Sequence, residues 1–278
     1  MLKTRIVTAM ILFAAFLCAL FFLPSWGWVG IMALVAAAAC WEWGALMGQP
    51  GSRRLVFAAL MFIACAGIAL AFPSAVGMEG HTSDSAWQVG RWFYFPAGVF
   101  WLLIVPLWLR HRWTLQHRLV GCVTGVLVIL PTWLALVQLR QLGVGQLLAI
   151  MAVVWLADVA AYFSGRAFGR HKLALTISPG KTWEGAIGGG LAVILYGFLF
   201  SSRLPQALSE SSLLLLFVLL VLTAISIVGD LFESLLKRQA GLKDSSNLLP
   251  GHGGVLDRID SLTSTLPLVA LVWFGFNA

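Results

Sequence analysis

The chain has 278 residues, of which 60% are hydrophobic and only 10% charged, and its mean hydropathy is +0.92. Too few polar residues remain to cover a water-soluble globule, so the composition excludes an ordinary soluble domain and favours a lipid-embedded protein. The net charge of +7 does not indicate a nucleic-acid partner, because basic residues of multi-span proteins mark cytoplasmic loops.

Nine apolar segments follow one another along the chain, and each approaches the roughly 20 residues that a helix needs to cross a bilayer core. They predict an all-α fold, a polytopic transmembrane helical bundle, with spans at about 6–23, 27–47, 55–77, 92–109, 119–139, 146–165, 185–202, 212–230 and 261–276. Pro24-Ser25-Trp26 is not a small-residue cleavage site, so we expect the first helix to be retained. We expect one integral membrane domain, 1–278, with N-terminal spans over about 1–140 and catalytic spans and loops over about 141–278.

Basic residues predict the orientation of these spans. Fifteen of the 18 Lys and Arg residues fall in connections on one side, whereas Arg91, Arg140 and Arg203 fall on the other. Because Lys and Arg gather in cytoplasmic loops, we expect the N-terminus in the cytoplasm. With nine spans, Ala278 then lies outside.

Two connections on the cytoplasmic side, 166–184 and 231–260, are long and rich in Gly, Ser, Lys, Asp and His. The eighth apolar run continues into the second connection with no helix breaker before Gly241, which suits a helix C-terminus. Spacings of three and four residues place four polar side chains on one face of that helix: Asp230, Glu233, Ser234 and Lys237. A helix end whose charges meet water has the same pattern, so the spacing alone leaves a structural role open.

Glycines surround His252 in the run Pro250-Gly251-His252-Gly253-Gly254. Glycine allows close backbone approach and can direct N–H groups at an anion. Asp257 and Asp260 follow at helical spacing, and we expect Asp257 at the border of the loop and not deep in the bundle. Carboxylates suit Mg²⁺, which typically binds one or two of them together with substrate phosphates. Carboxylates for a metal ion, together with N–H groups and basic side chains for phosphate, favour phosphoryl or nucleotidyl transfer.

The first polar connection contains Ser178-Pro179-Gly180-Lys181-Thr182. Gly-Lys-Thr is also found in NTPase P-loops, but that pattern needs glycine where this chain has Leu175. We also expect no β-strand before it, so we predict small residues and a lysine around an anion without a P-loop. In the next span, Gly188-Gly189-Gly190 indicate close helix packing.

Two acids, Glu42 and Asp158, interrupt apolar runs. Carboxylates within a membrane span are candidates for functional sites. Both lie near the cytoplasmic ends of their spans, where they can also reach water or cap a helix. We expect a structural role for Glu42, and both a site role and a structural role stay open for Asp158.

The second polar connection resembles the signature of the phosphatidate cytidylyltransferase (CDP-diacylglycerol synthase) family. The similarity covers Ser234-Leu-Leu-Lys237-Arg238, then Lys243-Asp244-Ser-Ser246, then Pro250-Gly-His252-Gly253-Gly254 and Asp257-Arg258-Ile-Asp260. Segments 155–169 and 177–185 also resemble this family, whereas the N-terminal spans are similar in hydropathy only. The resemblance implies a nucleotidyltransferase that joins CTP to phosphatidic acid, giving CDP-diacylglycerol and pyrophosphate for phospholipid biosynthesis.

The resemblance implies Mg²⁺, with room for a second cation, held by Asp230 and Asp257, and Asp158 is a further candidate ligand. The expected partners are CTP, phosphatidic acid, membrane lipid and a second copy in a homodimer, with no nucleic acid. The expected location is the inner membrane of a bacterium, with the active site facing the cytoplasm. The expected catalytic residues are Asp230, Asp257, Lys237 and Arg258. The expected substrate-binding residues are Ser178, Lys181, Thr182, Ser234, Arg238, Lys243, His252, Gly253 and Gly254.

We expect direct in-line displacement, because the lipid phosphate is already anionic and the sequence pairs no histidine with a particular serine. A CDP-alcohol phosphotransferase is the nearest rival enzyme, but its DxxDGxxAR core is absent: Ser261 follows Asp260 where that core has glycine. A transporter or lipid flippase would use the intramembrane acids, yet it leaves the two polar connections unexplained.

Overall fold

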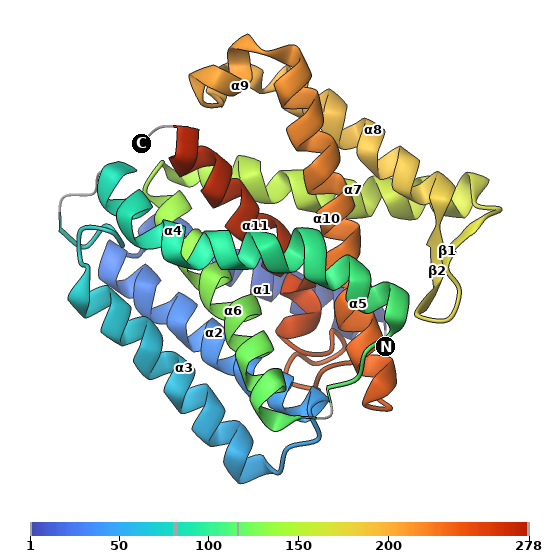
Figure 1. Cartoon of the computed structure of the whole chain (residues 1–278), viewed down its shortest axis with the longest axis horizontal. Helices are drawn as coiled ribbons and strands as arrows, with labels where there is room; N and C mark the ends of the chain where they lie inside the picture. Colours follow the sequence, from blue (N-terminus) through green and yellow to red (C-terminus); the bar gives the residue numbers. More distant parts are fainter. Residues whose placement is uncertain (1, 80–82, 116, 277–278) are drawn as a thin grey trace.

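The computed structural model describes residues 2–79, 83–115 and 117–276, with side chains from Ile6 onward in the first helix. Figure 1 shows a bundle of long helices with one small β-hairpin at its edge. The elements are α1 (Leu2–Phe22), α2 (Ser25–Leu46), α3 (Gly51–Ala71), α4 (Ser83–Val99), a π-helical turn (Phe100–Ile104), α5 (Val105–His111), α6 (Arg118–Arg140), α7 (Val144–Phe168), β1 (Lys172–Ala174), β2 (Ser178–Thr182), α8 (Trp183–Leu199), a 3₁₀ turn (Ser201–Arg203), α9 (Gln206–Glu210), α10 (Ser212–Gln239) and α11 (Leu256–Phe276).

The predicted all-α membrane fold is confirmed. Among the described residues, seven helical segments are long and apolar enough to cross a membrane: Ser25–Leu46, Gly51–Ala71, Ser83–His111, Arg118–Arg140, Val144–Phe168, Ser212–Gln239 and Leu256–Phe276. Ile6–Phe22 and Trp183–Leu199 are shorter apolar helices, so all nine predicted segments are helical. Large apolar side chains such as Phe22, Leu70 and Leu199 are exposed, as expected for helices that contact lipid. The number of crossings and their orientation stay predictions.

Helix ends differ from the predicted bounds where a local signal outweighs hydropathy. α3 ends at Ala71, earlier than predicted, because Phe72 precedes Pro73 and a residue before proline disfavours the helical conformation. The helix predicted from residue 92 begins at Ser83 and runs to His111. α10 ends next to Gly241, whose φ of +70° is the left-handed conformation expected after a helix.

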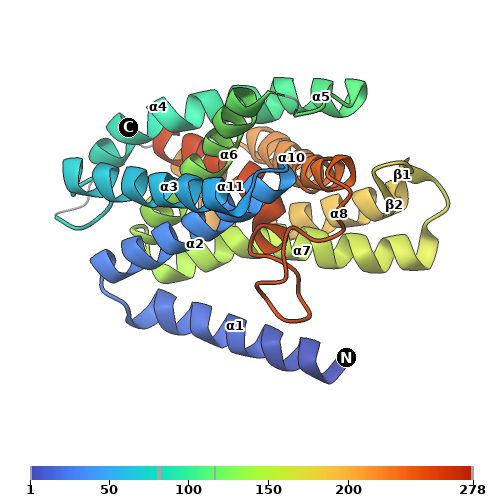
Figure 2. The ribbon, with the colours of Figure 1, turned by 90° about the horizontal axis from the view of Figure 1, so that it is seen from below.

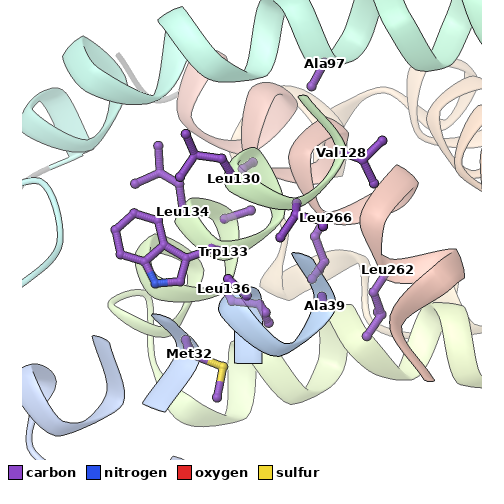
Figure 3. Packing of buried hydrophobic residues seen from close by; sticks show 14 of the residues in the cluster. Met32, Ala39, Ala97, Val128, Leu130, Trp133, Leu134, Leu136, Leu262 and Leu266 are labelled. Carbon is purple, nitrogen blue, oxygen red and sulfur yellow. The ribbon is translucent and has the colours of Figure 1, made fainter. Parts of the chain in front are cut away.

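The hydrophobic core surrounds α6, and Figure 3 shows side chains of α6 packed against α2 and α11. Trp133 and Leu134 are buried there. The indole N–H of Trp28 donates to the carbonyl oxygen of Leu136 at 3.3 Å, and that of Trp43 donates to the carbonyl oxygen of Gly121 at 2.9 Å. The N-terminal helices thus build the core that supports the helices carrying the two polar connections.

A β-hairpin joins α7 to α8, so the expectation that no strand precedes Gly180-Lys181-Thr182 is wrong. Lys172 pairs with Thr182 and Ala174 pairs with Ser178 in an antiparallel ladder, which satisfies the backbone as the chain reverses. Lys181 and Thr182 lie within strand β2 itself, which leads directly into α8. A P-loop instead follows a strand, so its absence still holds for this segment.

The glycines of α8 allow close contact with α7, as predicted. A Cβ atom at Gly189 would lie 2.9 Å from the carbonyl oxygen of Ala157, and one at Gly188 would collide with the side chain of Ser164. Figure 2 shows α1 at the periphery of the bundle, beginning on the side of the molecule where α10 ends. The hairpin and the connection after α10 also lie toward that side (Figure 1).

Candidate active site

A cavity of about 580 Å³ lies between α7, α8, α10, α11 and the hairpin. Its polar lining consists of Asp158, Tyr162, Arg166, Ser178, Lys181, Thr182, Thr223, Ser226, Asp230, Asp257, Arg258 and Asp260. Its lining also includes small and apolar residues of the helices, such as Ala157 and Ile227. Asp230 and Thr223 are seven residues apart on α10, which corresponds to about 10 Å along a helix. The cavity therefore reaches from the polar hairpin into the membrane helices.

Asp230 links the two polar connections. Its Oδ2 atom forms an ion pair with Lys181 Nζ of β2 at 2.5 Å. One turn further along α10, the hydroxyl of Ser234 donates to Asp230 Oδ1 at 3.2 Å. Both oxygens of this carboxylate thus have partners, and Ser234 acts on Asp230 without lining the cavity itself.

Asp257, the second residue of α11, lies at the border of the loop, as expected, and is buried there, with only 8% of its surface exposed. Its Oδ2 atom accepts hydrogen bonds from the amide and the hydroxyl of Ser245, at 2.8 and 2.9 Å, and from the amide of Gly254 at 2.8 Å. Gly253, at φ +80°, has no room for a side chain, since a Cβ there would lie 2.7 Å from Asp257 Oδ2. The connection after α10 folds over this carboxylate.

Lys237 lies between two carboxylates. Its Nζ atom is 2.7 Å from Asp257 Oδ1 and 3.1 Å from Glu233 Oε1, and its side chain is 13% exposed. Glu233, Ser234 and Asp230 share its helix face, as the spacing predicts. Lys237 is absent from the cavity lining, so in this arrangement it holds Asp257 and does not face the cavity directly.

The structure brings seven of the predicted site residues to this cavity and leaves the others outside its lining. Those in the lining are Asp158, Ser178, Lys181, Thr182, Asp230, Asp257 and Arg258. Those outside it are Ser234, Lys237, Arg238, Lys243, His252, Gly253 and Gly254. Arg238 and Lys243 are exposed. The chemical roles expected for both groups stay predictions.

Four polar residues of the lining had no predicted site role, namely Tyr162, Arg166, Thr223 and Ser226, and Asp260 was noted only for its helical spacing from Asp257. The guanidinium of Arg166 donates to the hydroxyl of Tyr162 at 3.1 Å. Asp158, Tyr162 and Arg166 are spaced four residues apart on α7, which places them along one helix face. That spacing is visible in the sequence, whereas the charge of Arg166 by itself indicates only the orientation of the spans.

The lining suits a divalent cation by its chemistry. Asp158, Asp230, Asp257 and Asp260 offer carboxylate oxygens to one cavity, and such hard ligands fit Mg²⁺. Within the described ranges, no group of three or more His, Cys, Asp or Glu residues is already arranged to hold a metal ion. Lys181 and Lys237 instead occupy one oxygen each of Asp230 and Asp257. The donor set therefore fits Mg²⁺, with two lysines beside it.

Residues 3–276 match the model of the cytidylyltransferase family. The chain is similar to a protein of Pseudomonas aeruginosa named phosphatidate cytidylyltransferase, with 41% identity over 282 residues, 98% of this chain and 97% of the relative. A Haemophilus influenzae protein of the same name is 35% identical over 289 residues, 99% of each chain. A Brucella suis protein, also of that name, is 49% identical over 131 residues, 46% of this chain and 47% of its own.

Proposed function

The chain belongs to the cytidylyltransferase family, and we propose that it transfers the cytidylyl group of CTP to phosphatidic acid, giving CDP-diacylglycerol and pyrophosphate. The observation that carries this proposal is a single cavity with aspartates and cations at the hairpin and helix-lined walls that reach toward the membrane interior. Such a cavity suits a reaction between a charged nucleotide and the phosphate of a lipid.

The proposed step is one in-line displacement. An oxygen of the lipid phosphate attacks the α-phosphorus of CTP, and the bond from that phosphorus to the β-phosphate oxygen breaks. Pyrophosphate leaves with the electron pair of the broken bond. The attacking oxygen is already anionic at neutral pH, so no side chain has to act as nucleophile.

The contacts of Thr182 and of His252 support this direct route. Thr182 Oγ1 accepts a hydrogen bond from the amide of Gly185 at 3.1 Å and caps α8. In the described part of the chain, the buried Nδ1 atom of His252 has no hydrogen-bond partner, so no serine is paired with it through this atom. His252 is also absent from the cavity lining. A hydroxyl nucleophile normally needs a base beside it.

We assign phosphate binding to the cations that line the cavity, Lys181, Arg166 and Arg258. Asp230 and Asp257 are the proposed ligands of Mg²⁺, with Asp158 beside them and room for a second cation. When bound, the metal offsets negative charge on the phosphates. Lys237 keeps Asp257 Oδ1 in place through the 2.7 Å contact, and Lys181 does the same for Asp230.

The protein is a multi-pass membrane protein. We place it in a bacterial inner membrane, as its bacterial relatives suggest, with the cavity open to cytoplasmic CTP. The charge bias of the connections supports this orientation. A homodimer without nucleic acid is the proposed assembly.

Purified protein in detergent micelles, incubated with CTP, MgCl₂ and dioleoyl-phosphatidic acid, tests the proposal. We expect release of pyrophosphate that depends on phosphatidic acid, together with formation of CDP-diacylglycerol. Dioleoylglycerol, which lacks the phosphate, is the matched control and should give no release. Pyrophosphate release that is independent of the lipid, or no release from folded protein, would contradict the proposal.

A further inference from the structure

Glu42 lies in α2, far along the chain from the second polar connection, 231–260, and its surface is 0% exposed. Four hydrogen bonds from residues of that connection end on its carboxylate. The hydroxyl of Ser246 and the amide of Val255 donate to Oε1, at 2.6 and 2.9 Å. The hydroxyl of Ser245 and the amide of Leu256 donate to Oε2, at 3.1 and 2.6 Å. One carboxylate of the N-terminal half therefore binds both ends of the segment 245–256.

The hydroxyl of Ser245 lies between two carboxylates, 3.1 Å from Glu42 Oε2 and 2.9 Å from Asp257 Oδ2. A serine hydroxyl has one proton, so it can donate to only one of them at a time. The backbone amide of Ser245 already donates to Asp257 at 2.8 Å. Ser245 thus connects the buried acid of α2 directly to the aspartate that lines the cavity.

Gly254 makes this arrangement possible. A Cβ atom at Gly254 would collide with the hydroxyl of Ser245 and lie 2.5 Å from Glu42 Oε1. The amide of Gly254 donates to Asp257 Oδ2 at 2.8 Å. Glycine at this position therefore lets Glu42, Ser245 and Asp257 approach one another. This packing requirement accounts for Gly254 without any contact with substrate.

We propose that Glu42 is a positioning residue, which fixes Asp257 in the cavity by holding Ser245 and the first amides of α11. The amides at a helix N-terminus lack partners within the helix, and a carboxylate satisfies them and interacts well with the helix dipole. Glu42 thus has the structural role that we expect from the sequence. The segment that it orders leads into Asp257, the proposed metal ligand. This inference rests on the proposed function.

The variant Glu42→Gln tests the proposal because it keeps the size of the side chain. Its amide nitrogen cannot accept a hydrogen bond, so one backbone amide, that of Val255 or of Leu256, would face another donor, and the serine hydroxyl on the same side would have to turn and accept instead. We expect faster hydrogen–deuterium exchange of the amides in 245–256, measured without substrate.

We also expect kcat of the Glu42→Gln variant to fall about 10- to 100-fold, as for other residues that orient metal ligands. The half-saturating MgCl₂ concentration should rise, whereas KM for phosphatidic acid should change little. Glu42→Asp, which keeps the carboxylate, should recover part of kcat.

Gln138→Leu is the matched control. Gln138 is also 0% exposed, accepts a hydrogen bond from the hydroxyl of Tyr94 at 2.7 Å and donates to the carbonyl oxygen of Ala86 at 3.1 Å, away from the cavity. We expect this variant to lower the melting temperature at least as much as Glu42→Gln. Its kcat, its MgCl₂ dependence and the exchange of 245–256 should stay at the wild-type level.

The positioning role is overturned if Glu42→Gln lowers only the melting temperature, or if Gln138→Leu reduces kcat and shifts the MgCl₂ dependence equally. If Glu42→Gln cannot be recovered folded, Ser246→Ala removes one of the four donors and should give smaller changes in the same direction; unchanged exchange and kcat would then overturn the role. Wild-type protein without lipid-dependent pyrophosphate release contradicts the proposed function instead. In that case exchange of 245–256, compared with and without MgCl₂ in both variants, still decides whether Glu42 orders Asp257.

Discussion

Lys181 of the β-hairpin forms an ion pair with Asp230 of α10, with 2.5 Å between Nζ and Oδ2. Lys181 belongs to the first polar connection and Asp230 immediately precedes the second, so this contact brings both connections to one site. Their side chains are 24% and 28% exposed, and both line the cavity. A partly exposed pair of this kind contributes little to stability. The ion pair instead holds the hairpin close to the aspartates of the cavity.

The first prediction concerns Lys181→Met, which removes the ammonium group and keeps a long side chain. We expect kcat/KM for CTP to fall roughly 100-fold, since a cation aimed at the reacting phosphates is lost. The free energy of unfolding should change by less than about 1 kcal/mol. Lys172→Met is the control, because Lys172 lies in β1 of the same hairpin but does not line the cavity. Equal losses in both variants would show that only the net charge of the hairpin matters.

The second prediction separates the two aspartates by stability. Asp230→Asn and Asp257→Asn should each lower kcat by several orders of magnitude, because each loses a proposed metal ligand. Asp257→Asn should also destabilise the protein by roughly 1.5–3 kcal/mol, since the buried carboxylate loses its charged contact with Lys237, which keeps Glu233 as its partner. Asp230→Asn breaks a partly exposed pair and should cost less than about 1 kcal/mol.

Thermal unfolding in detergent and turnover at several MgCl₂ concentrations measure both effects. Near-normal turnover of either variant at limiting MgCl₂ would show that the residue is not a metal ligand. Equal melting temperatures for the two variants would contradict the difference in stability that we expect from the deeper burial of Asp257.

The third prediction is the stereochemical course. A single displacement inverts the configuration at the α-phosphorus, whereas two displacements through a nucleotidyl-enzyme retain it. We expect inversion, because His252 has no partner at Nδ1 in the described residues and Thr182 caps a helix. A chiral α-thio analogue of CTP, with the configuration of the product determined, decides the question. Retention would exclude the direct route and would turn attention to Ser234 or Ser178 as the nucleophile.

The fourth prediction is the topology, which rests on the fifteen-to-three bias of basic residues. A reporter active only outside the cytoplasm should give signal when fused to Ala278, which lies outside the described residues. The same reporter inserted within 231–260 should be silent. A silent fusion at Ala278 in a well-expressed, membrane-inserted protein would change the span count by one.

Composition and local spacing determined the helices and one face of the site. Apolar runs separated by breakers predict membrane helices because each helix satisfies its own backbone in lipid. The face that carries Asp230, Ser234 and Lys237 follows from the 3.6-residue repeat, and the end of α10 follows from Gly241. These features depend on residues within one or two turns of one another, so they can be read along the chain.

The tertiary structure alone decided which partners these residues have. The hairpin needs pairing between strands of three and five residues, which are too short to show strand-like alternation. Asp257 is buried because the segment from Gly241 folds back over it, and Lys237 faces Asp257 for the same reason. Glu42 meets Ser245 across most of the chain. Such contacts depend on how distant helices pack, and hydropathy and spacing within a segment contain no information about that packing.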